Sequence, residues 1–124
     1  MSRREPPADP TPEEMPPLPA AAFHILVALA ESDRHGYAIM QEVAERSGGR
    51  TKLNPGTLYT TLRRLLEQGL IVELAEREVA GGQDERRRHY RLTPAGRRAA
   101  QRELARLGEL VDLGRRAGLA PRRT

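Results

Sequence analysis

The sequence predicts a mainly α-helical fold with one small antiparallel β-hairpin and a long C-terminal helix, an α+β domain in a chain of 124 residues. Three observations support this prediction. Apolar residues recur at helical spacing in four stretches, the pattern becomes extended after Gly69, and a charged, glycine-containing segment divides the extended stretch into two strands. A chain of this length is sufficient for one domain with a modest core.

Composition excludes several classes of protein. The net charge is +4 and all basic residues except Lys52 are arginine, whose guanidinium groups suit phosphates and base edges, although a skewed genomic base composition would give the same bias. The absence of cysteine excludes disulfides, thiolate metal sites and cysteine catalysis. The longest strictly apolar run, residues 25–30, is far shorter than the ~20 residues that span a bilayer, and the N-terminus does not read as a signal peptide. We therefore expect a cytoplasmic protein without membrane association or cofactors.

The N-terminal segment differs in composition from the rest of the chain. Seven of the ten prolines precede Ala20, mixed with acidic residues. Such a segment buries too little apolar surface to offset the entropy lost on ordering. Residues 1–18 are therefore predicted to be a disordered tail.

Residues 20–31 form the first predicted helix, which is apolar on nearly all sides. Such a helix must be covered on both sides. The domain's own core covers one side, so we expect the other to meet a second subunit. His24 lies within this apolar run. We interpret it as an interface side chain, because a lone histidine in such a run more often packs in an interface than binds a metal ion.

Ser32, Asp33 and Gly36 predict a turn before a second helix, which runs to about Ser47 and ends at a glycine pair. This helix is followed by a short polar connector, residues 50–54, and then by a third helix. The residues predicted to be buried in the second helix are Ile39, Met40 and Val43.

The third helix has defined ends, with Asn54 as N-cap, Pro55 at the first helical position and Gly69 at the left-handed stop. Its apolar face consists of Leu58, Leu62, Leu65 and Leu66, and its outward face of Thr57, Thr60, Arg63, Arg64 and Glu67. Small hydroxyls beside guanidinium groups can enter a DNA major groove and donate to phosphates or base edges. The element order is that of a helix-turn-helix, while an amphipathic helix in a three-helix domain without DNA function stays the alternative.

An extended pattern follows the third helix, with residues 71–78 predicted as an outgoing strand and residues 90–93 as the returning one. The loop between them carries Arg86, Arg87 and Arg88. A basic hairpin directly after an arginine-bearing helix could reach backbone phosphates or an adjacent minor groove. A charged loop is usually only exposed to solvent. The combination of this hairpin with the preceding helix instead favours a winged helix-turn-helix.

Thr93 and Pro94 predict the start of the last helix by the same capping logic. Glycines in its second half weaken the helix, so it is expected to fray before Pro121. This helix could pack on its own domain or on a second subunit. We favour a dimer in which it packs on the first helix of the partner subunit, because that helix is apolar on both sides and also needs a partner. Spacings of four, three, four and three define a seam for lengthwise helix packing at Ala100, Leu104, Leu107, Val111 and Gly114.

Three motifs occur in order along the chain: HGYAIMQEV at 35–43, PGTLYTTLRRLLEQGLI at 55–71 and RRRHYRLTPAGRR at 86–98. In sequence and spacing they resemble the PadR-like winged helix-turn-helix transcriptional regulators, and the resemblance extends from Phe23 to about Val111. The short C-terminus resembles the small subfamily with a single dimerisation helix.

The resemblance implies a dimeric bacterial or archaeal repressor. Helix 56–68 would enter the major groove, the hairpin would contact the flanking backbone, and the last helix would dock on the partner. Tyr59 would lie at the edge of the recognition helix, where it packs partly and can reach DNA. His89 departs from the family, in which an aromatic residue is commoner, and the absence of tryptophan argues against a drug site built by stacking on tryptophan.

On this interpretation the chain comprises the tail 1–18, a winged helix-turn-helix DNA-binding domain at 19–93, a dimerisation helix at 94–118 and a frayed basic tail at 119–124. The expected function is regulation of transcription by a homodimer on a palindromic operator in double-stranded DNA, as a repressor that a small-molecule effector releases. The predicted DNA-binding residues are Asn54, Thr57, Tyr59, Thr60, Arg63, Arg64, Arg86, Arg87 and Arg88. The residues predicted for the dimer interface or an effector pocket are Phe23, Leu26, Leu104, Leu107 and Val111.

Two other classes were weighed. A winged-helix adaptor could bind a partner protein instead of DNA, in which case the acidic residues of the hairpin, Glu76, Glu78, Asp84 and Glu85, would matter as much as the arginines. An enzyme is disfavoured because no nucleophile and base pair can be nominated. His24, His35 and His89 lack the spacing of metal ligands.

Overall fold

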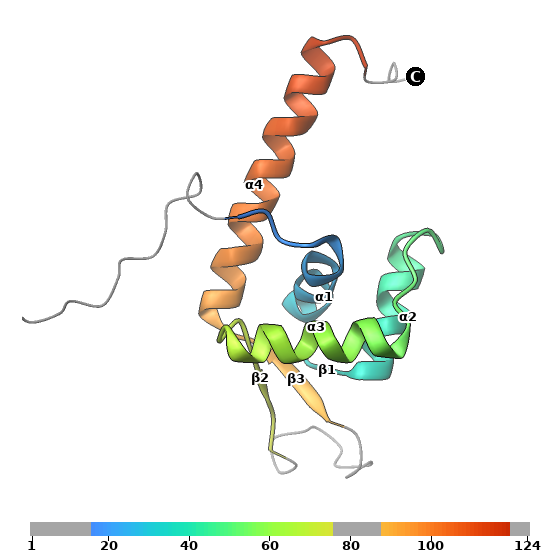
Figure 1. Ribbon diagram of the computed structural model, residues 1–124, viewed down its shortest axis with the longest axis vertical. Coiled ribbons are helices and arrows are strands. Elements are labelled where there is room, and N and C mark those ends of the chain that lie inside the picture. The colour runs from blue at the N-terminus through green and yellow to red at the C-terminus, as the bar shows by residue number, and fades with distance from the viewer. Residues whose placement is uncertain (1–15, 76–87, 120–124) are drawn as a thin grey trace, which may run out of the picture.

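The computed structural model describes residues 16–75 and 88–119 of the chain (Figure 1). It confirms the predicted α+β fold, mainly helical with a small sheet and a long C-terminal helix. Arg86, Arg87 and the acidic hairpin residues lie outside the described part. The elements are α1 (Ala20–Glu31), β1 (Arg34–His35), α2 (Gly36–Arg46), α3 (Pro55–Glu67), β2 (Ile71–Glu73), β3 (His89–Leu92) and α4 (Pro94–Arg116).

Helices α3 and α4 begin where short-range signals in the sequence place them. The Asn54 side-chain oxygen accepts a hydrogen bond from the Thr57 N–H at 2.8 Å, and the Thr93 hydroxyl accepts one from the Gly96 N–H at 3.0 Å. Gly69 has a φ of 72°, the left-handed conformation predicted for it after α3. The cap of α2 was not predicted: His35 Nδ1 accepts from the Ala38 N–H at 3.1 Å.

The strands form one antiparallel sheet in the order β1-β3-β2. In β2 and β3, Ile71 pairs with Leu92 and Glu73 with Tyr90, as expected for the base of a hairpin. Strand β1 pairs with β3 and lies where the sequence predicted only a turn. It was not predicted because a strand of two residues is too short to show an alternating pattern. We call β2, β3 and the segment between them the wing.

Helix α1 lies at the centre of the fold and contacts α2, α3, α4 and β3. Leu18, just before α1, is partly buried against the same core. Because α3 contributes its apolar face to this core, its polar face is left toward solvent. The largest fully buried side chains are Ile25, Leu26, Ile39, Val43, Leu58, Leu62, Leu65 and Ile71.

Helix α4 has two different halves. Its first half packs on the domain, with Gly96, Ala99 and Glu103 buried. Its second half extends away from the other elements (Figure 1). No helix in the described ranges is long and apolar enough to cross a membrane. Large apolar side chains at least half exposed on α4 are Leu104, Leu110, Val111 and Leu113.

Candidate DNA-binding surface

The outward face of α3 carries the predicted contact residues. Leu58, Leu62 and Leu65 are buried, which fixes the rotation of the helix about its axis. Within the described ranges no ion pair neutralises the arginines of this face. The exposed residues are Thr57, Thr60, Arg63 and Arg64, so two hydroxyls and two guanidinium groups are available to a polyanion.

Asn54 and Tyr59 are placed differently from the rest of the predicted set. The side-chain oxygen of Asn54 is engaged in capping α3. Tyr59 is 51% exposed, but its hydroxyl end lies against Gly36 at the start of α2. Asn54 therefore has an observed structural role, and Tyr59 lies at the edge of the face.

The wing contributes one described arginine to the candidate surface. Arg88 is exposed, with its Nε 3.5 Å from a carboxylate oxygen of Glu73 on β2. Tyr90, in β3, is buried. Its burial is the main cause that raises the pKa of its phenol, and the negative charge of Glu73 raises this pKa further. Arg88 thus pairs across the base of the wing while remaining open to solvent.

The base of the wing is tied to the helix-turn-helix by contacts that the sequence did not reveal. The guanidinium of Arg91 donates to both carboxylate oxygens of Asp33, at 2.8 Å from Nη2 and 3.1 Å from Nε. The rings of His35 and His89 meet edge to face with centroids 5.4 Å apart. The wing and α2 therefore share a fixed base.

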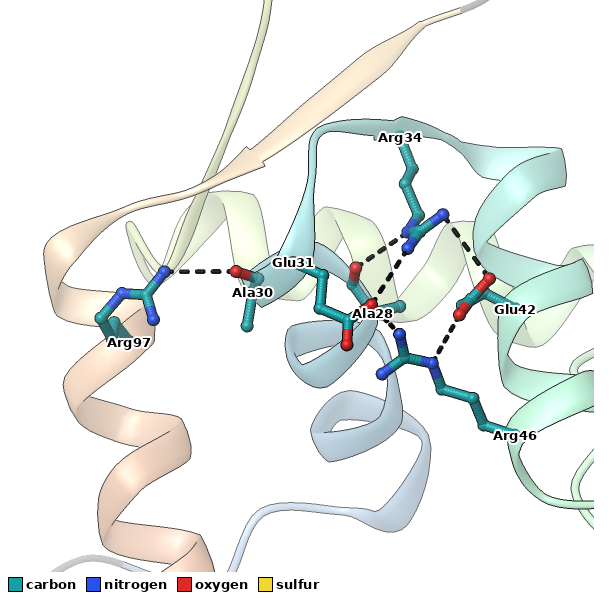
Figure 2. A network of polar contacts seen from close by, with 7 residues as sticks. All are labelled: Ala28, Ala30, Glu31, Arg34, Glu42, Arg46 and Arg97. Carbon is teal, nitrogen blue, oxygen red and sulfur yellow. Dashed lines mark hydrogen bonds and ion pairs between the residues drawn. The ribbon is translucent and has the colours of Figure 1, made fainter.

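A polar network fixes α1 to α2 on one side and to α4 on the other (Figure 2). Arg34 Nε donates to the Ala28 carbonyl at 2.9 Å, and Arg97 Nη2 donates to the Ala30 carbonyl at 3.4 Å. Both acceptors are in the last turn of α1, where carbonyl groups have no partner within the helix. These arginines serve the fold, whereas those of α3 are unpaired among the described residues.

The same network joins α1 and α2 through carboxylates. Arg46 pairs with Glu42 at 2.5 Å and also with Glu31, while Arg34 lies 3.6 Å from Glu42. The hydrogen bond from Arg46 lowers the pKa of Glu42 despite the opposing effect of burial. Helix α2, which supports α3, is thereby held on α1 by charge as well as by apolar packing.

The start of α4 is built on the turn that ends α3. The Thr93 hydroxyl donates to the Gly69 carbonyl at 2.7 Å, and the Thr93 N–H donates to the Leu70 carbonyl at 3.1 Å. A Cβ on Gly96 would lie 2.0 Å from the Leu70 carbonyl oxygen. Because no side chain separates them, α4 is in direct backbone contact with Leu70, in the turn between α3 and β2.

Further along α4, Glu103 is buried, with an exposed fraction of 6%. Its carboxylate accepts from Arg106 at 2.9 and 2.5 Å and from the Leu18 N–H at 3.3 Å. The Arg106 hydrogen bond lowers the pKa of Glu103 despite its burial. Glu103 therefore joins the segment before α1 to the middle of α4.

The residues predicted for a subunit interface or effector pocket differ in their exposure. Leu26 is fully buried in the domain's own core. Phe23 and Leu107 are partly exposed. Leu104 and Val111 are exposed by 63% and 51%, so these two and not Leu26 lie open on the described domain.

Three further exposed residues near the start of α3 were not predicted as contacts. Tyr37 is 55% exposed in the first turn of α2, and Arg50 and Lys52 are exposed in the connector. The sequence itself shows these two basic residues shortly before α3, the helix that carries the predicted contact residues. Across the described ranges, no group of three histidine, aspartate or glutamate side chains is placed to hold a metal ion.

Comparison with known proteins adds to this geometry. Residues 25–102 match the family described as the transcriptional regulator PadR-like family. A transcriptional regulator of Mycobacterium tuberculosis is 44% identical over 92 residues, which cover 74% of this chain and 79% of that protein.

Solved structures share the fold. A PadR family transcription regulator from Clostridium difficile superposes with a TM-score of 0.65 at 26% identity, covering 77% of this chain and 95% of the other. PadR of Bacillus subtilis in complex with operator DNA has a TM-score of 0.59 at 23% identity, covering 71% of this chain and 48% of that one.

Proposed function

The chain belongs to the PadR-like family of transcriptional regulators, and on this premise we propose that it is a repressor that binds a palindromic operator as a homodimer. The single observation that carries the proposal is the outward face of α3, where Thr57, Thr60, Arg63 and Arg64 are exposed. Hydroxyl and guanidinium groups of this kind donate to phosphates and base edges in the major groove. The solved PadR of Bacillus subtilis was itself bound to operator DNA, which supports the proposal.

Each part of the surface has its own role in this proposal. Helix α3 enters the major groove and reads base edges. Arg88, together with Arg86 and Arg87 of the wing, contacts the flanking backbone by charge, and Tyr59 contacts DNA from the edge of α3. Phosphate contacts set affinity on every sequence, whereas base contacts set the preference for an operator.

The second half of α4 supports the homodimer. Leu104 in the middle of the helix and Leu110, Val111 and Leu113 beyond it are at least half exposed, and apolar side chains in water favour burial against a partner. In the proposed dimer these side chains pack against the partly exposed Phe23 side of the partner's α1, and a two-fold axis supplies the contact twice.

Release by a small-molecule effector completes the proposal. Apolar spaces between helices are common ligand sites, and the one proposed lies between α4 and the partner's α1, with Phe23, Leu104, Leu107 and Val111 at its wall. A ligand there would change the spacing of the subunits and so of the two α3 helices. A thermal-shift screen of aromatic and cationic compounds tests this part, and a screen without any hit would remove its support.

DNA binding is tested by removing the two arginines of α3. Arg63→Ala combined with Arg64→Ala should abolish preference for DNA taken from upstream of the chain's own gene. The double variant should also lower the salt slope of binding, by roughly 0.9 for each of the two arginines that neutralises a phosphate instead of reading a base. Fluorescence anisotropy over a series of salt concentrations measures both effects.

The matched control replaces Arg115 and Arg116, which are exposed at the end of α4, by alanine. It removes the same charge, so a general effect of net charge would weaken both variants equally. Loss of DNA binding confined to the α3 variant is the expected result. A wild-type protein that shows no binding at low salt would refute the proposed function.

A further inference from the structure

Gly36 and Tyr59 are in close contact at the junction of α2 and α3. A Cβ built on Gly36 would lie 3.1 Å from the Tyr59 hydroxyl oxygen and 3.4 Å from its Cε1. The same Cβ would lie 3.3 Å from Cδ2 of Leu58. The tyrosine ring therefore lies on the first turn of α2, in space that a side chain at position 36 would enter.

Tyr59 occupies an intermediate position on α3. It follows the buried Leu58 and precedes the exposed Thr60, and half of its own surface is exposed. Its ring reaches further from the backbone than a threonine side chain does. If the ring pointed straight outward, it would hold the first half of α3 away from a surface that Thr60 has to touch.

We propose that Gly36 is a positioning residue for DNA recognition that acts through Tyr59. Without a side chain at position 36, the Tyr59 ring rests on α2, and the shorter Thr57 and Thr60 can come close to base edges together with Arg63. The inference rests on the proposed DNA-binding function. It adds a residue that does not itself touch DNA and yet determines how closely α3 approaches the groove.

Substitution at this position is informative because the fold can absorb it. Gly36 does not have a positive φ, so its backbone conformation suits alanine. Two of the three nearest atoms belong to the outer end of the Tyr59 side chain, which can rotate away without moving the backbone, and the third, Cδ2 of the buried Leu58, has to yield by a few tenths of an ångström. The methyl group of Gly36→Ala therefore shifts the ring from α2 toward the DNA-facing side of α3.

The experiment compares discrimination between two duplexes. One duplex is selected from random DNA by the wild-type protein, and the other has the same base composition in shuffled order. Gly36→Ala should lower the ratio of the two affinities by about tenfold, because shallower insertion loses base contacts before phosphate contacts. The thermal unfolding midpoint should change little, so loss of discrimination is separated from loss of the folded state.

A second variant tests whether the effect passes through the ring. In a Tyr59→Ser background, Gly36→Ala should cause no further loss of discrimination, since the group it displaces is gone. Gln41→Ala is the matched control, because Gln41 is an exposed residue of the same helix as Gly36. It should keep the wild-type ratio.

Two outcomes would overturn the inference alone while leaving DNA binding intact. One is a Gly36→Ala variant with the wild-type ratio, and the other is an equal loss with and without the Tyr59 ring. A wild-type protein that binds neither duplex would instead overturn the proposed function and this inference with it.

Discussion

Gly96 shows how a single residue can determine where a whole helix lies. Its missing side chain allows α4 to rest on the Leu70 carbonyl, and a Cβ there would stand only 2.0 Å from that oxygen. The obstacle is backbone, which cannot rotate away as a side chain can. The Thr93 cap of α4 could be predicted from the sequence, but this approach could not, because Leu70 lies in a turn that is distant from Gly96 along the chain.

Gly96→Ala is therefore expected to be strongly destabilising, by about 3 kcal/mol or more, since relief of the contact requires backbone movement. Urea unfolding followed by circular dichroism measures the loss. Gly108→Ala, at an open position on the same helix, should instead stabilise the protein by roughly 0.5–1 kcal/mol. A Gly96→Ala protein as stable as the wild type would contradict the contact.

Leu26 shows where residue-level prediction from sequence reaches its limit. Helix α1 is apolar on nearly every side, so its sequence does not reveal which side faces the domain's own core. The structure buries Leu26 completely and leaves Phe23 partly exposed. Only the positions of the surrounding helices make this distinction, and a single helical pattern contains no information about them.

Among the elements, α3 and α4 were predicted closely because their ends are marked locally. Asparagine before proline and threonine before proline satisfy free N–H groups within three residues. Strand β1 and the contacts at the base of the wing were missed because they join distant parts of the chain. Arg91 binds Asp33 across 58 positions, and Glu103 binds Leu18 across 85.

Glu103 gives the attachment of α4 a dependence on pH. Its pKa in the folded chain is below the ordinary value of 4.5, chiefly because Arg106 donates to it. Because the pKa is lowered, the ionised carboxylate stabilises the folded chain fully at pH values above the ordinary pKa. This stabilisation is lost as the pH falls through the lower pKa of the folded chain. Stability should therefore decline below about pH 4.5.

Glu103→Gln tests this dependence. The variant should be less stable than the wild type near neutral pH, and the difference should shrink as pH falls below 4.5. Urea unfolding at a series of pH values measures it. Glu109→Gln, which alters an exposed carboxylate of the same helix, should leave the wild-type curve nearly unchanged; a constant gap between wild type and Glu103→Gln at all pH values would argue against the assignment.

At the scale of the whole molecule, the two helices with proposed roles in recognition and assembly are rigidly connected. Helix α4 begins on the turn that ends α3, through Thr93 and Gly96, and Arg97 attaches α4 to the end of α1. In a dimer joined by the exposed half of α4, the distance between the two α3 helices would follow from how the α4 helices pack. An effector between the subunits would then alter DNA binding without deforming either domain.

In the proposed homodimer, two copies of the chain present α3 to successive major grooves on one face of the duplex. Hydroxyl-radical footprinting of the protein on DNA upstream of its gene tests this most directly. We expect two protected segments related by a dyad, with centres about 34 Å or a multiple of that distance apart. A single protected segment, or binding that leaves no protected position, would contradict it.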